Sequence, residues 1–297
     1  MANTFKRKRS LKHWEPIDWV LFVVLTVFGL LVVIPFLNVV SVSLTTYKEY
    51  LTSPLIIFPR VIDLKAYKEI VSDTRIVTGY RTSFTIIAIG VPLSLLLCSS
   101  FGYALSRRNY PGRGIIFGIV LFTMLFSGGI VPLYLVIRAL KLTNTLWSVI
   151  FVGGMNTFYM ILCYNYFQTL PDSLVESARL DGASEWHILF RIILPLSLPI
   201  MATLTLFLLV DKWNEWFSAM IFIRRSDIQP LQLVLRSIII DNQTAMEISS
   251  SMEITDRPNQ QGIKMAAVLV TMLPIMCIYP FLQKHFAKGI MIGAIKA

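Results

Sequence analysis

The sequence predicts an all-helical membrane protein with six transmembrane helices. Of its 297 residues, 55% are apolar and 15% charged, whereas an ordinary soluble domain carries about 25% charged residues. The apolar residues also gather in long uncharged runs. A spanning helix needs about 20 apolar residues in a row and satisfies its own backbone hydrogen bonds in lipid. We expect spans at about 19–44, 82–106, 114–137, 145–168, 192–222 and 263–283.

The first run follows a short basic segment, residues 1–16. Five lysines and arginines lie between Lys6 and Lys12, which also suits a signal peptide. A signal core, however, has about 7–15 apolar residues and a small-residue cleavage site after it. This run is longer and lacks such a site, so we expect a retained anchor and a transmembrane domain covering residues 17–297.

Basic residues close to the spans predict the orientation. Arg107, Arg108 and Arg113 adjoin the second and third runs, and Lys284 and Lys288 follow the last one. Such juxtamembrane charges favour the cytoplasmic side, so we place both termini in the cytoplasm and the loops at 48–81 and 224–262 outside. Attraction of these basic residues to anionic lipid headgroups then explains the net charge of +10, and we expect no nucleic-acid partner.

Motifs for enzymatic chemistry are scarce in this sequence. It has no Gly-x-x-x-x-Gly-Lys-Ser/Thr phosphate loop, so the chain should not hydrolyse ATP by itself. The three histidines lack metal-ligand spacing. Cys98, Cys163 and Cys277 lie inside apolar runs, which suggests inert lipid-facing or core thiols. We therefore expect neither a metal, nor a cofactor, nor a catalytic residue in this chain.

Residues 172–190, here called the elbow, are more polar than the runs on either side. Ser173 and Glu176 have the spacing of a capping box at the start of a short helix. Gly182 suits the left-handed residue that ends such a helix, and Ser184 can open a second one. The predicted structure is a helix-turn-helix beneath the bilayer. The alternative is an ordinary polar connection that happens to be helical.

The fifth run begins with two prolines. Pro195 and Pro199 are four residues apart, and each removes a backbone donor and crowds the turn before it. We therefore expect a bend at the start of this span.

The elbow resembles the EAA signature of permease subunits in binding-protein-dependent ABC importers. The matching residues are Glu176, Ser177, Ala178, Gly182 and, nine residues later, Ile192-Ile193-Leu194-Pro195, with Ser177 standing where the family usually has Ala. Asp181-Gly182-Ala183 and Leu194-Pro195-Leu196 resemble the carbohydrate-uptake, MalG-like branch. The tail around Gln283–Gly289 and the long outer loops look most like permeases for polygalacturonan- or alginate-derived oligosaccharides.

This resemblance implies a type I importer permease in the bacterial inner membrane. One such subunit forms half of a pathway for an oligosaccharide, and a second homologous permease forms the other half. Two ATPase subunits, which use ATP and Mg, would dock below, and an extracytoplasmic solute-binding protein above. The elbow then corresponds to the coupling helix. The ATPase-coupling residues that the resemblance implies are Glu176, Ser177, Ala178, Asp181, Gly182, Ala183, Leu194 and Pro195.

A polar group interrupts the last apolar stretch before the second long loop. It consists of Asp211, Trp213, Asn214 and Glu215. A charge in mid-membrane costs at least about 2.5–3.5 kcal/mol, so this group should face a cavity, the bundle interior or the interface. Aromatic and carboxamide groups suit sugars, which makes it a candidate for the sugar pathway. In the alternative, the span ends near Val210, Trp213 and Trp216 are interfacial belt residues, and Lys212 pairs with an acid.

Two other classes of membrane protein fit the composition. A secondary transporter driven by an ion gradient usually shows internal repeats and buried acids in mid-membrane. A membrane-embedded glycosyltransferase would have clustered acids and histidines on one face. The sequence shows neither a repeat nor such a cluster.

Overall fold

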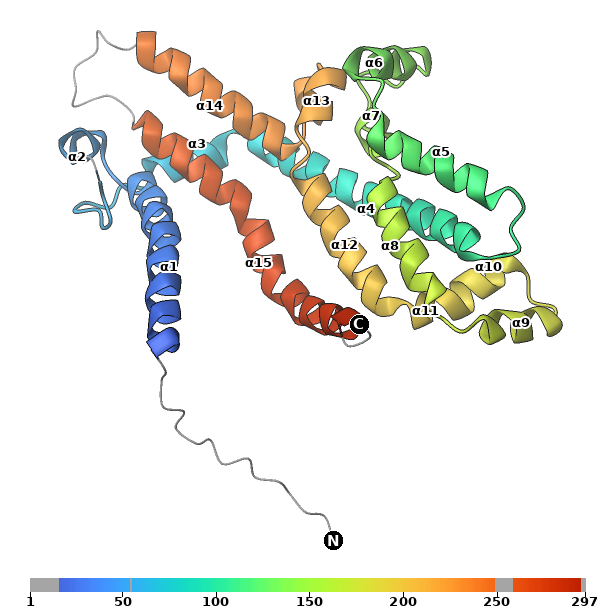
Figure 1. The fold of residues 1–297 in the computed structure, drawn as a ribbon. Coiled ribbons are helices and arrows are strands. Elements are labelled where there is room, and N and C mark those ends of the chain that lie inside the picture. Colours follow the sequence, from blue (N-terminus) through green and yellow to red (C-terminus); the bar gives the residue numbers. More distant parts are fainter. Residues whose placement is uncertain (1–15, 54, 249–258, 295–297) are drawn as a thin grey trace. The chain divides into compact units, whose positions relative to one another are not determined.

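A computed structural model describes residues 16–53, 55–248 and 259–294, with side chains for 16–53, 55–241 and 259–278. Over these ranges the chain is helical and contains no strand (Figure 1). The helices are α1 (Pro16–Ser43), α2 (Tyr47–Thr52), α3 (Lys65–Ser72), α4 (Thr74–Ser106), α5 (Arg113–Leu125), α6 (Ile130–Ala139), α7 (Leu146–Phe151), α8 (Thr157–Gln168), α9 (Asp172–Leu180), α10 (Glu185–Ile188), a π-helical turn (Leu189–Ile193), α11 (Leu194–Leu196), α12 (Leu198–Trp213), α13 (Phe217–Phe222), a 3-10 turn (Ser226–Ile228), α14 (Leu231–Ile248) and α15 (Gln260–Ala294).

The structure divides into two compact units. The first contains the described residues up to Lys68 and those from Met246 to Ala266, and the second contains Glu69–Ala245 and the described residues from Ala267 onward. The predicted basic cluster at Lys6–Lys12 lies outside the described residues.

The first unit is built on α1, whose side chains are mostly exposed, as expected for a helix surrounded by lipid. The loop after α1 folds back onto its end. Asn38 Nδ2 donates to the Ile56 carbonyl at 3.1 Å, the Asp63 amide donates to the Leu44 carbonyl at 2.8 Å, and the hydroxyls of Ser43 and Tyr67 lie 2.8 Å apart. These bonds fasten the loop to the membrane anchor.

The spans are less continuous than the hydropathy predicts. Among the described residues, α1, α4 and Gln260–Ile278 of α15 are each long and apolar enough to cross a membrane, and two bent pairs bring the number to as many as five. One pair is α5 with α6, at 116° to each other. Gly129, at φ +88°, lies in the break between them. The expectation of a single helix over 114–137 is therefore wrong.

The fourth run is also interrupted. α7 ends at Phe151 and α8 begins at Thr157, and Gly153 between them has φ +72°. The hydropathy pattern does not reveal this break, because glycine and its neighbours are as uncharged as the residues of a continuous helix. We refer to residues 152–156 as the α7–α8 break.

The bend expected from Pro195 and Pro199 is confirmed. The segment Glu185–Leu196 meets α12 at 87°, with Ser197 between them. The turn before Pro195 is π-helical, which is one way in which a helix accommodates a missing backbone donor. This bend turns the chain from the elbow into the bundle.

Within the second unit, α4 packs against α8 and α12. α4 turns a row of small residues inward, one every four positions: Ser94, Cys98, Gly102 and Ser106, all buried. A Cβ built at Gly102 would lie 2.7 Å from the Cβ of Cys163 on α8. The two helices approach this closely because small residues leave room, a common way of joining helices in lipid.

Candidate functional site

The elbow is a helix-turn-helix, as its sequence predicts, but its first cap differs from the prediction. α9 begins at Asp172, so the N-cap residue is Pro171, which offers no side-chain acceptor. Ser173 therefore falls within the first turn, and the predicted capping box with Glu176 is wrong. The Asp172 carboxylate occupies the first turn instead, where the helix dipole favours a negative charge.

The turn between the two elbow helices matches the prediction. Gly182 has φ +81°, the left-handed conformation that glycine adopts without steric cost. Its amide donates to the Arg179 carbonyl, and the Ala183 amide donates to the Ala178 carbonyl, both at 3.0 Å. This pair of bonds is a Schellman motif. Ser184 then caps α10 by accepting from the His187 amide at 3.3 Å.

Side chains from α4 tie the elbow to the helical bundle. Tyr103 Oη donates to Glu185 Oε2 at 2.7 Å, and Arg179 Nε donates to Glu185 Oε1 at 2.7 Å. Arg107 Nη1 lies 3.5 Å from the Asp172 carboxylate, and its guanidinium lies 5.0 Å from the centre of the Tyr103 ring. The elbow is therefore in direct contact with the end of α4.

The charge of Glu185 is stable at neutral pH. Burial pulls the pKa of Glu185 upward, but hydrogen bonds from Arg179 and Tyr103 outweigh it, and the pKa lies below its ordinary value. Because the pKa is lowered in the folded state, the stabilisation is present at neutral pH and is lost only as the pH falls through the lowered value. The contact thus persists throughout the neutral range.

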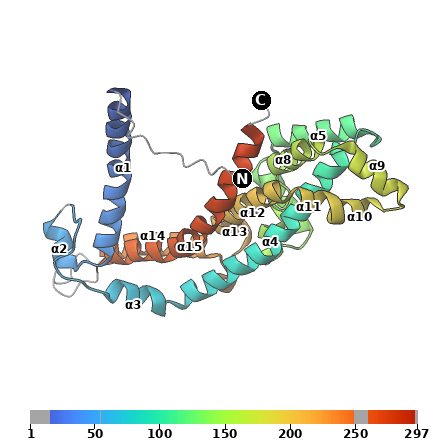
Figure 2. The same ribbon diagram turned by 90° about the horizontal axis from the view of Figure 1, so that it is seen from below.

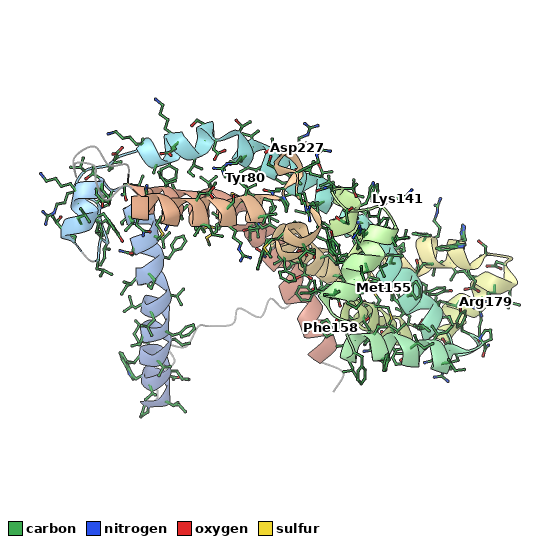
Figure 3. The ribbon with its side chains drawn as sticks, turned by 90° about the horizontal axis from the view of Figure 1, so that it is seen from above. Tyr80, Lys141, Met155, Phe158, Arg179 and Asp227 are labelled. Atoms are coloured by element: carbon green, nitrogen blue, oxygen red, sulfur yellow. The ribbon has the colours of Figure 1, made fainter. Side chains whose placement is uncertain are left out.

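The other face of the elbow is exposed. Val175 and Ala178 point into the core, whereas Leu180 is 89% exposed and Leu174 and Glu176 are also on the surface. Figure 3 shows Arg179 on this part of the molecule.

The structure places the predicted coupling residues in two groups. Glu176, Ser177, Ala178, Asp181, Gly182 and Ala183 are contiguous in α9 and its turn, while Leu194 and Pro195 lie in α11. The contacts of Tyr103 and Arg107 with the elbow were not predicted from the sequence. These residues lie far from the elbow in the chain, so only the fold reveals them.

A pocket of about 390 Å³ lies at the end of α12, here called the Asp211 pocket. Its lining residues are Val152, Gly153, Asn156, Tyr159, Leu208, Asp211, Lys212, Asn214, Glu215, Trp216 and Phe217. Figures 1 and 2 place the elbow helices α9 and α10 at the other end of the bundle from α13.

Three of the four predicted pathway residues line this pocket, and Trp213 does not. Trp213 is 2% exposed and packs against Tyr80 and Phe84 on α4, with ring centres 6.2 and 5.7 Å away. Trp216 occupies the pocket wall instead, with the Arg236 guanidinium 4.1 Å from its ring centre. α12 ends at Trp213, so helical periodicity could not predict which tryptophan faces inward.

The polar groups of the pocket are held in place but keep free acceptors. Tyr159 Oη donates to Asp211 Oδ2 at 2.6 Å, and Glu215 Oε1 accepts from the Ser218 amide at 2.9 Å. Asn214 Nδ2 donates to the Val210 carbonyl at 2.9 Å. Each carboxylate therefore has a second oxygen that can accept from a hydroxyl, beside the exposed ring of Trp216. In the described part of the chain, no cluster of histidine, cysteine or acidic residues could hold a metal ion.

The fold and its elbow define a polytopic transport subunit of the inner membrane. Residues 75–292 match the family described as the binding-protein-dependent transport system inner membrane component, and the chain belongs to this family. Members of the family are transport subunits and not enzymes themselves.

Similar proteins include two from Bacillus subtilis (strain 168). The polygalacturonan/rhamnogalacturonan transport system permease protein YtcP is 39% identical over 94% of this chain and 98% of its own length, and Protein LplC is 40% identical over 90% of each chain. Among solved structures, a chain of a bacterial ABC transporter involved in the import of the acidic polysaccharide alginate superposes with a TM-score of 0.81. Its sequence is 28% identical, and the superposition covers 92% of this chain and 99% of the transporter chain.

Proposed function

We propose that this chain forms half of the membrane pathway of an ABC importer for oligosaccharides and couples that pathway to ATP hydrolysis by partner subunits. The names of its relatives support oligosaccharides as the substrate class, and those of YtcP and the alginate importer make uronic-acid oligosaccharides the first to test. The observation that carries the proposal is the elbow. It is an exposed helix-turn-helix in which Glu185 bonds to Tyr103 of α4, and its first residue lies 3.5 Å from Arg107 at the end of α4.

The partners follow from this assignment. A second homologous permease supplies the other half of the pathway, two ATPase subunits bind ATP and Mg, and an extracytoplasmic binding protein delivers the sugar. Both termini and the elbow then face the cytoplasm, and the Asp211 pocket lies toward the outer side. Closure of the ATPases moves the elbow, and the Arg107–Asp172 ion pair and the Tyr103–Glu185 hydrogen bond pass this movement to α4 and the other spans as a rigid-body shift.

The alternative, a secondary transporter driven by an ion gradient, receives no support from the family match or from the relatives. Such a carrier would also give the elbow no role. The ATP requirement therefore separates the two mechanisms.

The purified chain alone is expected neither to bind nor to hydrolyse ATP. Hydrolysis should appear when the second permease and the ATPase subunits are co-purified with it, and should rise when the sugar-loaded binding protein is added. The measurement is phosphate release from detergent or nanodisc samples. ATP turnover by the isolated chain, at a rate that survives removal of contaminating ATPases, would overturn the proposal.

The two neighbouring tryptophans should behave differently. Trp216→Ala removes an exposed ring from the pocket, so uptake should fall about tenfold at normal protein levels, as for the loss of a well-packed contact residue. Trp213→Ala empties a buried site, costs about 3–5 kcal/mol and should reduce the amount of folded protein. Uptake and membrane abundance distinguish these outcomes.

A cysteine introduced in place of Asn214 provides an independent measurement of the same pathway assignment. In a Cys277→Ser background, Asn214→Cys should react with an impermeant thiol reagent added from outside, and the rate should change when sugar, binding protein and ATP are supplied. If the labelling rate is the same with and without sugar, binding protein and ATP, and both Asn214→Ala and Trp216→Ala transport normally, the pocket is not on the pathway.

A further inference from the structure

The most unusual side chain in the second unit is a buried lysine in the last turn of α12. Lys212 is 4% exposed. Its ammonium lies 3.5 Å from the Val149 carbonyl, 3.4 Å from that of Ile150 and 3.4 Å from that of Val152. The amine thus faces backbone oxygens where α7 ends and the α7–α8 break begins.

These contacts complete the backbone hydrogen bonding of α7. The last carbonyls of a helix have no intrahelical partner. Here the Ser148 carbonyl accepts from the Val152 amide at 3.2 Å, and that of Phe151 accepts from Gly154 at 2.9 Å. The carbonyls of Val149 and Ile150, which lie between these two, face Lys212. Val149 and Ile150 are buried, and a buried backbone carbonyl that lacks a donor is costly.

Two glycines lie along the path of the lysine side chain. Its methylene chain runs along Gly90 of α4, where a built Cβ would lie 3.4 Å from Cε. Gly153, in the α7–α8 break, has φ +72°, and a Cβ there would lie 4.0 Å from Nζ. The route is therefore lined by backbone from two different spans.

The residue before Lys212 holds the other side of the same break. Asp211 accepts from Tyr159 on α8, and Lys212 contacts the end of α7. Two consecutive residues of α12 thus contact both halves of the interrupted span. Val152 and Gly153 of the break form part of the wall of the Asp211 pocket, so these contacts lie directly behind that wall.

We propose that Lys212 is a positioning residue of the sugar pathway: a built-in cation that closes the end of α7 and, with Asp211, fixes the α7–α8 break as a wall of the Asp211 pocket. Interrupted helices in ion-driven carriers present free carbonyls to a transported cation. In this chain, the ammonium of Lys212 contacts such carbonyls. The role in transport rests on the proposed function, whereas the contacts of Asp211 and Lys212 on either side of the break are independent of it.

The test uses Lys212→Met, which keeps the length and apolar stem and removes the charge, and Lys212→Arg, which keeps the charge and its donors. Lys141→Met is the matched control, because it removes an exposed lysine in the same unit. Each is combined with Val152→Cys and Cys277→Ser. The chain is co-expressed with its partner subunits, and labelling of the thiol introduced by Val152→Cys with a small reagent reports the shape of the pocket wall without depending on transport.

In Lys212→Met, we expect the labelling rate at Val152→Cys to change at least about fivefold and uptake to fall at least about tenfold, as for buried acceptors that lose their donor. ATP hydrolysis stimulated by the binding protein should stay within about twofold, because the elbow and its ties to α4 are unchanged. Lys212→Arg should restore most of both signals, and Lys141→Met should change neither.

Unchanged labelling and uptake in Lys212→Met would overturn the proposal, as would equal changes in Lys212→Arg and Lys212→Met, since the charge would then be irrelevant. If Lys212→Met does not accumulate in the membrane, Lys212→Gln is measured by the same criteria. A labelling change in a chain that transports no oligosaccharide would support the positioning of the α7–α8 break by Lys212 and would reject the proposed function instead.

Discussion

Gly182→Val should abolish uptake while the protein still inserts into the membrane. At φ +81°, a β-branched residue costs at least about 1–2 kcal/mol, and the Schellman turn must rearrange to relieve that strain. No atom lies within 4 Å of a Cβ built at this glycine, so the rest of the chain is not disturbed. The direction of α10 and the surface offered to the ATPase would change. Uptake is measured in cells with equal membrane levels of the protein.

Gly129→Val is the matched control for this variant. Gly129 has φ +88° and equally open surroundings, but it lies at the break between α5 and α6. Backbone at φ +88° and ψ 177° is essentially restricted to glycine, so this replacement carries at least as much strain as Gly182→Val, but away from the elbow, and most of the uptake should remain. Similar uptake in the two variants would show that strain alone, and not the position in the elbow, decides the result.

Charge reversal in the elbow should have the same effect by another route. Glu176 is exposed on α9, and we expect it to pair with a basic residue of the ATPase, so Glu176→Lys would bring two positive charges together. Uptake should be lost, whereas Glu69→Lys, a reversal at an exposed site on α3, should leave it nearly unchanged. Transport near the parent level in both Gly182→Val and Glu176→Lys would reject the coupling role of the elbow.

Gly102→Ala should act on folding and not on coupling. The added Cβ would lie 2.7 Å from the Cys163 Cβ, 3.0 Å from the Tyr164 amide nitrogen and 3.1 Å from the Met160 carbonyl oxygen. Two of these atoms belong to the backbone of α8 and cannot rotate away. Forcing the helices apart costs about 1–3 kcal/mol, so the thermal midpoint and the yield of purified protein should both fall.

Gly118→Ala is the control for the packing effect. Gly118 is on α5, and nothing lies within 4 Å of a Cβ built there. In a helix interior, alanine is favoured over glycine by about 1 kcal/mol, so this change should be neutral or stabilising. Equal losses in Gly102→Ala and Gly118→Ala would contradict the close packing of α4 on α8.

Local signals in the sequence predicted the features that depend on neighbouring residues. Gly182 and Ser184 mark the turn and the second cap of the elbow, because left-handed backbone and side-chain capping are set within a few residues. Pro195 and Pro199 mark the bend for the same reason. The first cap was predicted incorrectly, since Ser173 and Pro171 both suit the start of a helix and only the fold decides between them.

Features that join distant segments could not be predicted in this way. Tyr103 and Glu185 meet because α4 ends beside α10, and Lys212 meets the end of α7 because the last turn of α12 lies beside it. Hydropathy indicated the interruption at Asp211, where Asp211, Asn214 and Glu215 line a pocket. It could not show that Trp213 faces the core, because the helix ends at that residue and the chain changes direction.

Uptake of a labelled galacturonan oligosaccharide into proteoliposomes tests the central claim most directly. The vesicles contain the assembled permease and ATPase subunits, with ATP and Mg inside, binding protein outside, and ionophores that collapse proton and sodium gradients. We predict accumulation that requires internal ATP and the binding protein, continues without ion gradients and is lost with Gly182→Val. Accumulation that persists without ATP and disappears with the ionophores would contradict the account.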